Sequence, residues 1–155
     1  MSVSKKAMIL AHRKIGLKIF NFFYKLKSYE VDYLAIHKND INLFKNIKKN
    51  KLIFEKKNKK KCWDIIYKEL IKKDIKICIL AWWPYIVPKK IIQIKELRII
   101  NLHPSYLPYG RGKDANFWAI VNQDPYGVSL MKVNSRIDEG DYYIRKKDSI
   151  TVSIY

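Results

Sequence analysis

Short apolar runs alternate along this chain with longer stretches whose apolar residues recur at helical spacing. Residues 7–11 form the first apolar run, which predicts a buried strand, and residues 15–27 carry the first helical pattern. The later segments continue the rhythm, with strands predicted at residues 31–36, 52–54, 75–82, 98–102, 127–133 and 142–145, and helices at residues 40–47, 63–73, 116–122 and directly after Pro88. Such alternation predicts an α/β fold in which helices cover a mostly parallel sheet.

The length of 155 residues suits one core, so we expect a single domain over residues 1–155. The chain has 32 Lys and Arg against 14 Asp and Glu, and its formal charge of +18 attracts anions such as a nucleic acid, a membrane surface or a phosphorylated small molecule. Residues 45–61 hold nine of the lysines and one glutamate. We interpret this tract as a solvated loop rather than a nucleic-acid surface, because Phe54 is its only aromatic residue and it has no arginine.

The two cysteines, Cys62 and Cys78, lie in unrelated contexts without C-x-x-C spacing. This pattern predicts reduced thiols rather than a disulfide or a zinc site. The apolar stretch at residues 7–11 is too short for the core of a signal peptide or for a membrane span. We therefore expect a soluble, cytoplasmic protein without a membrane partner.

Polar and aromatic segments follow three of the predicted strands, at residues 12–14, 82–85 and 101–112. In open α/β sheets, ligands bind outside the carboxyl ends of the strands, so we expect these segments to converge there. A dinucleotide site would need G-x-G-x-x-G after the first strand, and Gly16 stands alone at that place. NAD chemistry is therefore disfavoured.

Two polar pairs have the chemistry of a transfer reaction. Asn101 and His103 lie two residues apart on a predicted strand, so their side chains share one face and can stabilise an oxygen that becomes negative. Asp138 and Asp141 flank Gly140 between two predicted strands, and a carboxylate near His103 can relay protons from a reacting amine. Taken alone, the first pair fits a structural turn at least as well, and an ordinary Asp-Gly turn is the better interpretation of the second.

Five short pieces occur in one order: NLHPSYLP, YGRG, FWAI, GVSL and IDEGD. Their order and spacing resemble the catalytic domain of the formyltransferases that use 10-formyltetrahydrofolate. The resemblance covers about residues 75–150, and the earlier part agrees only in its rhythm of strands and helices. It implies a Rossmann-like, mostly parallel sheet flanked by helices.

The resemblance also implies roles for particular residues. Asn101 and protonated His103 would hold the oxyanion that forms when an amine attacks the formyl carbon, and Asp138 would support the histidine and accept the amine proton. No metal is implied. The folate, N10-formyltetrahydrofolate, would be held largely by the backbone of Trp83, Pro84, Tyr85, Ile86, Val87, Val133, Asn134 and Ser135.

The stretch LPYGRGKDANFW is similar to the nucleotide-sugar N-formyltransferases, which formylate dTDP-linked and related amino sugars for lipopolysaccharide biosynthesis. This similarity makes a nucleotide-linked amino sugar the expected acceptor and a homodimer a candidate assembly. The residues expected at the acceptor are His12, Arg13, Tyr109, Arg111 and Gly112. Two alternatives stay open: a methionyl-tRNA formyltransferase, and a non-catalytic basic protein of the same fold that binds nucleic acid.

Formyltransferases of this kind continue well past the aspartate loop, whereas this sequence stops at SITVSIY, a β-type run. We expect a truncated catalytic core whose uncovered apolar sheet face drives association. Such a core would bind folate and would formylate sugar nucleotides poorly.

Overall fold

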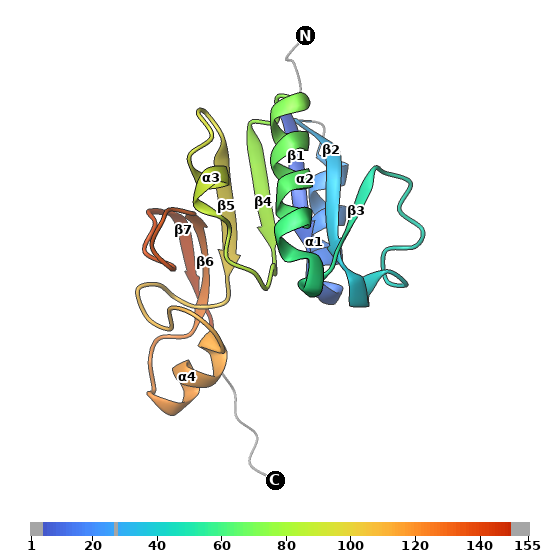
Figure 1. Ribbon diagram of the computed structural model, residues 1–155. Helices are drawn as coiled ribbons and strands as arrows, with labels where there is room; N and C mark the ends of the chain where they lie inside the picture. Colours follow the sequence, from blue (N-terminus) through green and yellow to red (C-terminus); the bar gives the residue numbers. More distant parts are fainter. Residues whose placement is uncertain (1–4, 27, 150–155) are drawn as a thin grey trace. The chain divides into compact units, whose positions relative to one another are not determined.

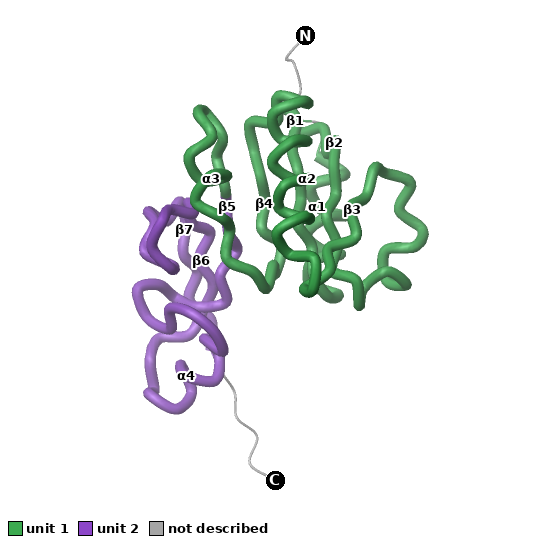
Figure 2. Tube along the Cα trace, viewed as in Figure 1, with its two compact units in different colours: residues 1–99 green, residues 100–155 purple. Residues whose placement is uncertain are grey.

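The computed structural model describes residues 5–26 and 28–149. The backbone forms two compact units, residues 1–99 (unit 1) and residues 100–155 (unit 2), which are coloured separately in Figure 2. Within the described residues, no helix is long and apolar enough to cross a membrane. The expected β-type run at the C-terminus spans residues 149–155, and all of it after Ser149 lies outside the described residues.

Unit 1 contains four parallel strands in the order β3-β2-β1-β4. These are β1 (Lys5–Ala11), β2 (Tyr29–His37), β3 (Lys51–Phe54) and β4 (Ile77–Ala81). Every residue of β4 is buried, as are the last five of β1. Central parallel strands are covered on both faces, which explains why their sequences are continuous apolar runs.

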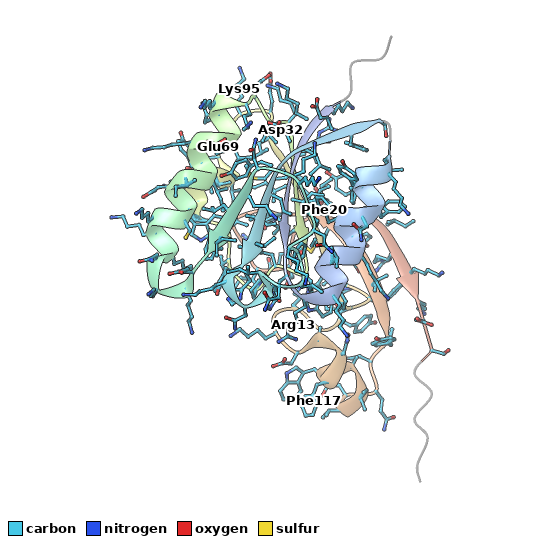
Figure 3. The ribbon with its side chains drawn as sticks, turned by 90° about the vertical axis from the view of Figure 1, so that its right-hand side faces the viewer. Arg13, Phe20, Asp32, Glu69, Lys95 and Phe117 are labelled. Atoms are coloured by element: carbon cyan, nitrogen blue, oxygen red, sulfur yellow. The ribbon has the colours of Figure 1, made fainter. Side chains whose placement is uncertain are left out.

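Two long helices, α1 (Arg13–Lys25) and α2 (Lys59–Lys72), cover opposite faces of the unit 1 sheet, as the two views in Figures 1 and 3 show. Phe20 on α1 is 2% exposed and points to the sheet in Figure 3. Gly16 lets α1 approach closely, because a Cβ there would lie 2.8 Å from the carbonyl oxygen of Ala81. The sheet and these helices form the core of unit 1.

Shorter elements connect the strands of unit 1. The 3₁₀ turns η1 (Lys38–Asp40) and η2 (Lys56–Asn58) follow β2 and β3, and the short helix α3 (Lys89–Ile92) begins after Pro88. The helix after Pro88 was expected from the sequence, since proline suits the first turn of a helix.

Unit 2 is built on an antiparallel ladder in the order β5-β6-β7. Strand β5 (Arg98–His103) begins at the end of unit 1, and β6 (Gly127–Lys132) and β7 (Tyr142–Lys147) follow. The helix α4 (Ala115–Val121) lies between β5 and β6 in sequence. The predicted strands and the helix of this region are therefore present.

Two predictions from the sequence are wrong. Residues 40–47 do not form a helix: only η1 (Lys38–Asp40) is helical, and turns follow. Asparagine and aspartate have low helix propensities, and the Asp40 carboxylate is bonded to His12 and to the Arg13 N–H. The lysine tract at residues 45–61 is not simply a loop, since it contains β3, η2 and the start of α2. Its lysines are exposed apart from the half-buried Lys49 and Lys51, so this regular structure places their charges in solvent.

Both cysteines are free and buried, as the sequence predicts. Burial raises the pKa of the Cys78 thiol to about 12. Cys78 therefore stays in the thiol form at neutral pH.

Candidate active site

His103 ends strand β5 and is 5% exposed. Its Nε2 lies 2.8 Å from the carbonyl oxygen of Gly110. A carbonyl oxygen can only accept, so Nε2 carries a hydrogen and donates it. The other ring nitrogen, Nδ1, lies 3.7 Å from Oδ2 of Asp138. The ring thus has an acceptor on each side.

Asp138 lies in the loop between β6 and β7 and is half-buried. Its Oδ2 accepts the backbone N–H of Gly112 at 2.9 Å, which joins the aspartate loop to the loop after β5. Its φ of 50° lies in the left-handed region, an uncommon conformation for a residue other than glycine. Such conformations persist where the surrounding structure imposes them, and they cluster at functional sites.

Asn101 precedes His103 by two residues on β5, and so shares its face. Asn101 pairs with Met131 across the ladder and is half-buried. An amide and an imidazole therefore lie on one face of β5, with a carboxylate beside the imidazole. Unit 2 holds all three residues that the sequence singled out as catalytic.

A second polar cluster lies in unit 1, where β1 and β2 end. His12 Nδ1 donates to Asp40 Oδ2 at 2.6 Å, and the same oxygen accepts the backbone N–H of Arg13 at 3.0 Å. His37 accepts the Asn39 N–H at its Nδ1 and lies 2.8 Å from the Tyr85 hydroxyl through its Nε2. The ring centroids of His12 and His37 are 4.9 Å apart. The expected convergence of residues 12–14 and 82–85 is therefore observed within this unit.

The electrostatics of this cluster follow from burial. Burial lowers the pKa of His37, the charge of His12 lowers it further, and Asp40 opposes the effect. His37 is thus held neutral, with its hydrogen on Nε2 directed at Tyr85. Burial also raises the pKa of Tyr85.

His12, His37 and Asp40 each offer a ligand atom, and these atoms lie within 4.8 Å of one another. The 2.6 Å between His12 and Asp40 is a hydrogen-bond distance, whereas two ligands of a tetrahedral zinc ion lie about 3.3 Å apart. We therefore interpret the cluster as a hydrogen-bonded network. The absence of a metal from the reaction stays a prediction.

The residues expected at the folate fall in both units. In unit 1, the rings of Trp83 and Tyr85 pack against Phe54, with centroids 5.0 and 4.8 Å away, while Val87 is buried. The neighbouring Pro84 and Ile86 are exposed. In unit 2, the loop after β6 begins with the half-buried Val133 and Asn134 and the exposed Ser135.

The expected acceptor residues of unit 2 lie on the loop after β5. Tyr109 and Arg111 are exposed, and Gly112 has φ 82° and donates its N–H to Asp138. Arg111 Nη1 is 3.8 Å from Glu139 Oε1, a loose ion pair at the surface. Its guanidinium therefore remains available to an anion.

Residues 26–153 match the family described as formyl transferase. The chain belongs to the formyl transferase family. A methionyl-tRNA formyltransferase from Ehrlichia ruminantium (strain Gardel) is 37% identical over 75 residues, which is 48% of this chain and 25% of that protein. The aligned region thus spans about a quarter of the length of this curated relative.

The fold of this formyl transferase family member is similar to solved structures over nearly the whole chain. A phosphoribosylglycinamide formyltransferase from Campylobacter jejuni has a TM-score of 0.82 at 22% identity and covers 99% of this chain and 87% of its own. A formyltetrahydrofolate deformylase from Pseudomonas syringae has a TM-score of 0.80 at 15% identity, covering 96% and 52%. The predicted fold class, a Rossmann-like α/β sheet flanked by helices, is confirmed. None of these three names is that of a nucleotide-sugar enzyme.

Several polar residues near the candidate sites of this formyl transferase family member were not expected from the sequence. His37 is the last residue of β2 and Asp40 follows in η1, where ligand sites are expected in such folds, so their position could have identified them. Ser129 and Arg145 contact the loop after His103. Ser129 lies within the GVSL piece, but its role was not expected, and no local pattern marks Arg145, because the contacts of both depend on the pairing of β5, β6 and β7.

Proposed function

We propose that this chain transfers a formyl group from N10-formyltetrahydrofolate to the amine of a nucleotide-linked amino sugar. The observation that carries the proposal is the grouping of Asn101, His103 and Asp138 in unit 2, together with membership of the formyl transferase family. In the reaction, the amine nitrogen attacks the formyl carbon and forms the new N–C bond. The tetrahedral oxyanion then collapses, the bond to N10 breaks, and N10 takes up a proton.

Each of the three residues has a role in this scheme. Asn101 and protonated His103 stabilise the oxyanion, which is the charge that develops only in the transition state. Asp138 supports the imidazolium and accepts the amine proton, either directly or through a water. The 3.7 Å between His103 Nδ1 and Asp138 Oδ2 is longer than a hydrogen bond, and such distances commonly shorten when substrate binds.

Two segments are proposed to bind the folate through their backbone, residues 83–87 in unit 1 and residues 133–135 in unit 2, and each is anchored within its own unit. Support for the first segment comes from its anchoring: the Tyr85 hydroxyl contacts His37, and its ring stacks on Phe54 at 4.8 Å. A segment held this way can present its backbone groups in one conformation. Asn134 likewise accepts the Arg136 N–H at 2.9 Å, which closes a turn in the second segment.

For the acceptor, the stretch around Arg111 supports a sugar diphosphate. A guanidinium binds phosphate oxygens in a bidentate manner, and the loose pair with Glu139 leaves it accessible. In unit 1, His12 and Arg13 are separate candidate groups for an anion, at the start of α1. The formal charge of +18 attracts a nucleotide sugar and a tRNA alike, so it does not decide between them.

Methionyl-tRNA is the second candidate acceptor. It is favoured by the 37% identity to a methionyl-tRNA formyltransferase and by the exposed lysines of residues 45–61. Multiple phosphate contacts would make such binding strongly salt-dependent.

The test is to offer the purified chain 10-formyltetrahydrofolate with a panel of dTDP- and UDP-amino sugars and, separately, methionyl-tRNA. We expect transfer to at least one amino sugar, little change with salt, and loss of transfer in His103→Ala. Transfer to methionyl-tRNA alone, falling steeply as salt rises, would replace the sugar by the second candidate. Binding to tRNA without transfer to any amine would favour the non-catalytic alternative.

A further inference from the structure

Three side chains from neighbouring strands form a row across unit 2. His103 on β5 pairs with Ser129 on β6, and Ser129 pairs with Arg145 on β7. Residues directly opposite each other in an antiparallel ladder project from the same face. The row therefore lies on the face that carries the imidazole of His103.

Ser129 is fully buried, and its hydroxyl makes two hydrogen bonds to the loop after β5. Its Oγ accepts the backbone N–H of Leu107 at 3.0 Å and donates to the carbonyl oxygen of Ser105 at 2.7 Å. One side chain thus satisfies a buried donor and a buried acceptor two residues apart. Without the hydroxyl, both backbone groups would lose a partner, which is costly in a buried place.

Arg145 contacts the same loop from β7. Its Nη1 donates to the carbonyl oxygen of Leu107 at 2.6 Å. Its guanidinium carbon lies 4.6 Å from the ring centroid of Tyr106 and 4.1 Å from that of Tyr142. These distances are typical of cation–π contacts, which here hold the planar guanidinium against the loop.

The loop that Ser129 and Arg145 contact continues to Gly110, which is the hydrogen-bond partner of His103. Gly110 supplies the carbonyl oxygen 2.8 Å from His103 Nε2. Gly110 also packs tightly, because a Cβ built on it would lie 3.1 Å from the Cβ of Ser105. A shift of residues 105–107 would therefore displace Gly110 and release the imidazole.

We propose that Ser129 and Arg145 are positioning residues that hold the loop at residues 104–110 so that Gly110 orients the His103 imidazole. The inference rests on the proposed function for the role of His103, but the orientation itself can be measured without any substrate. Neither residue touches the reacting atoms in this proposal. Each acts through the loop backbone.

The experiment compares Ser129→Ala, Arg145→Ala and Arg145→Lys with wild type in the full chain. The chain has three histidines, so the imidazole NMR signals can be assigned with His103→Gln as reference. Lys146→Ala is the matched control, because Lys146 is exposed and its side chain projects from the opposite face of β7. Signals of His12 and His37 report whether unit 1 stays folded.

We expect the His103 ring signals to shift in both alanine variants. In Ser129→Ala the Leu107 amide should also exchange with solvent about tenfold faster, because that N–H loses its buried acceptor. Arg145→Lys should give an intermediate result, since lysine keeps the charge but not the planar stack. In the transfer assay, kcat should fall about tenfold while KM for the formyl donor stays unchanged, the pattern of a lost transition-state interaction. Lys146→Ala should match wild type throughout.

Unchanged His103 signals in folded Arg145→Ala would overturn the inference, even if Ser129→Ala failed to fold. If the variants change the His103 signals but the wild-type chain transfers no formyl group, the proposed function alone is refuted. A fall in kcat without any change at His103 would show that Arg145 acts by another route, and would likewise overturn it.

Discussion

The carboxylate of Asp138 accepts the backbone N–H of Gly112 at 2.9 Å. This bond links two loops that leave different strands, because Asp138 lies between β6 and β7 and Gly112 follows β5. The same carboxylate oxygen faces His103 Nδ1 at 3.7 Å. The hydrogen bond from Gly112 therefore determines where the negative charge lies relative to the imidazole.

We predict that Asn101→Ala and His103→Ala each lower the formyl-transfer rate on the order of 10²- to 10³-fold, the usual cost of removing one oxyanion donor. Steady-state kinetics with the accepted amine would measure this. Asn122→Ala, at an exposed position after α4, is the control and should retain wild-type rates. Near-normal turnover in both active-site variants would show that the oxyanion is stabilised elsewhere.

Asp138→Asn should reduce transfer far more than Asp141→Asn. Asp138 is half-buried beside the imidazole, whereas Asp141 is exposed and uses only its backbone oxygen, which accepts the Lys132 N–H at 2.8 Å. An amide in place of Asp138 could neither pair with the imidazolium nor accept the amine proton. Equal losses in the two variants would contradict the assignment of roles within the aspartate loop.

Gly140→Ala should destabilise unit 2 by more than about 2 kcal/mol, because backbone strain and overlap are among the few causes of large single-residue effects. A Cβ on Gly140 would overlap the carbonyl oxygen of Lys132. Gly112→Ala is the comparison, since no atom lies within 4 Å of its Cβ position and only its φ of 82° is strained. Urea denaturation would compare the two, and a smaller loss for Gly140→Ala would contradict the close approach.

We predict that the stability of unit 1 depends on pH through the lowered pKa of His37. Its folded-state pKa is lowered, chiefly by burial, so the unfolded chain binds a proton first as the pH falls. The stabilising contribution is present above the ordinary histidine pKa of about 6.5 and is lost as the pH falls through the lowered value. His37→Phe keeps a ring beside Tyr85 but cannot titrate. Urea denaturation between about pH 7.5 and 5 should show a smaller loss of unfolding free energy in this variant than in wild type. An equal or larger loss would exclude His37 as the titrating group.

The amino-acid sequence by itself determined the local features of the chain. Continuous apolar runs predicted β1 and β4, because strands that are covered on both faces need apolar side chains at successive positions. The two-residue spacing of Asn101 and His103 determined that they share a face, since alternation along an extended backbone is a local property. The segment at residues 40–47 was misjudged, because its apolar spacing suggested a helix that the asparagines disfavour.

Only the tertiary structure decided which distant side chains meet. The approach of Asp138 to His103, and of His37 to Tyr85, joins residues 35 and 48 positions apart in the sequence. The contacts of Ser129 and Arg145 with the loop after β5 depend on the register between three strands. Periodicity specifies which face a side chain occupies but not which strand lies beside it. That choice follows from the packing and hydrogen bonding of the whole unit, and so the contacts around His103 became visible only in the fold.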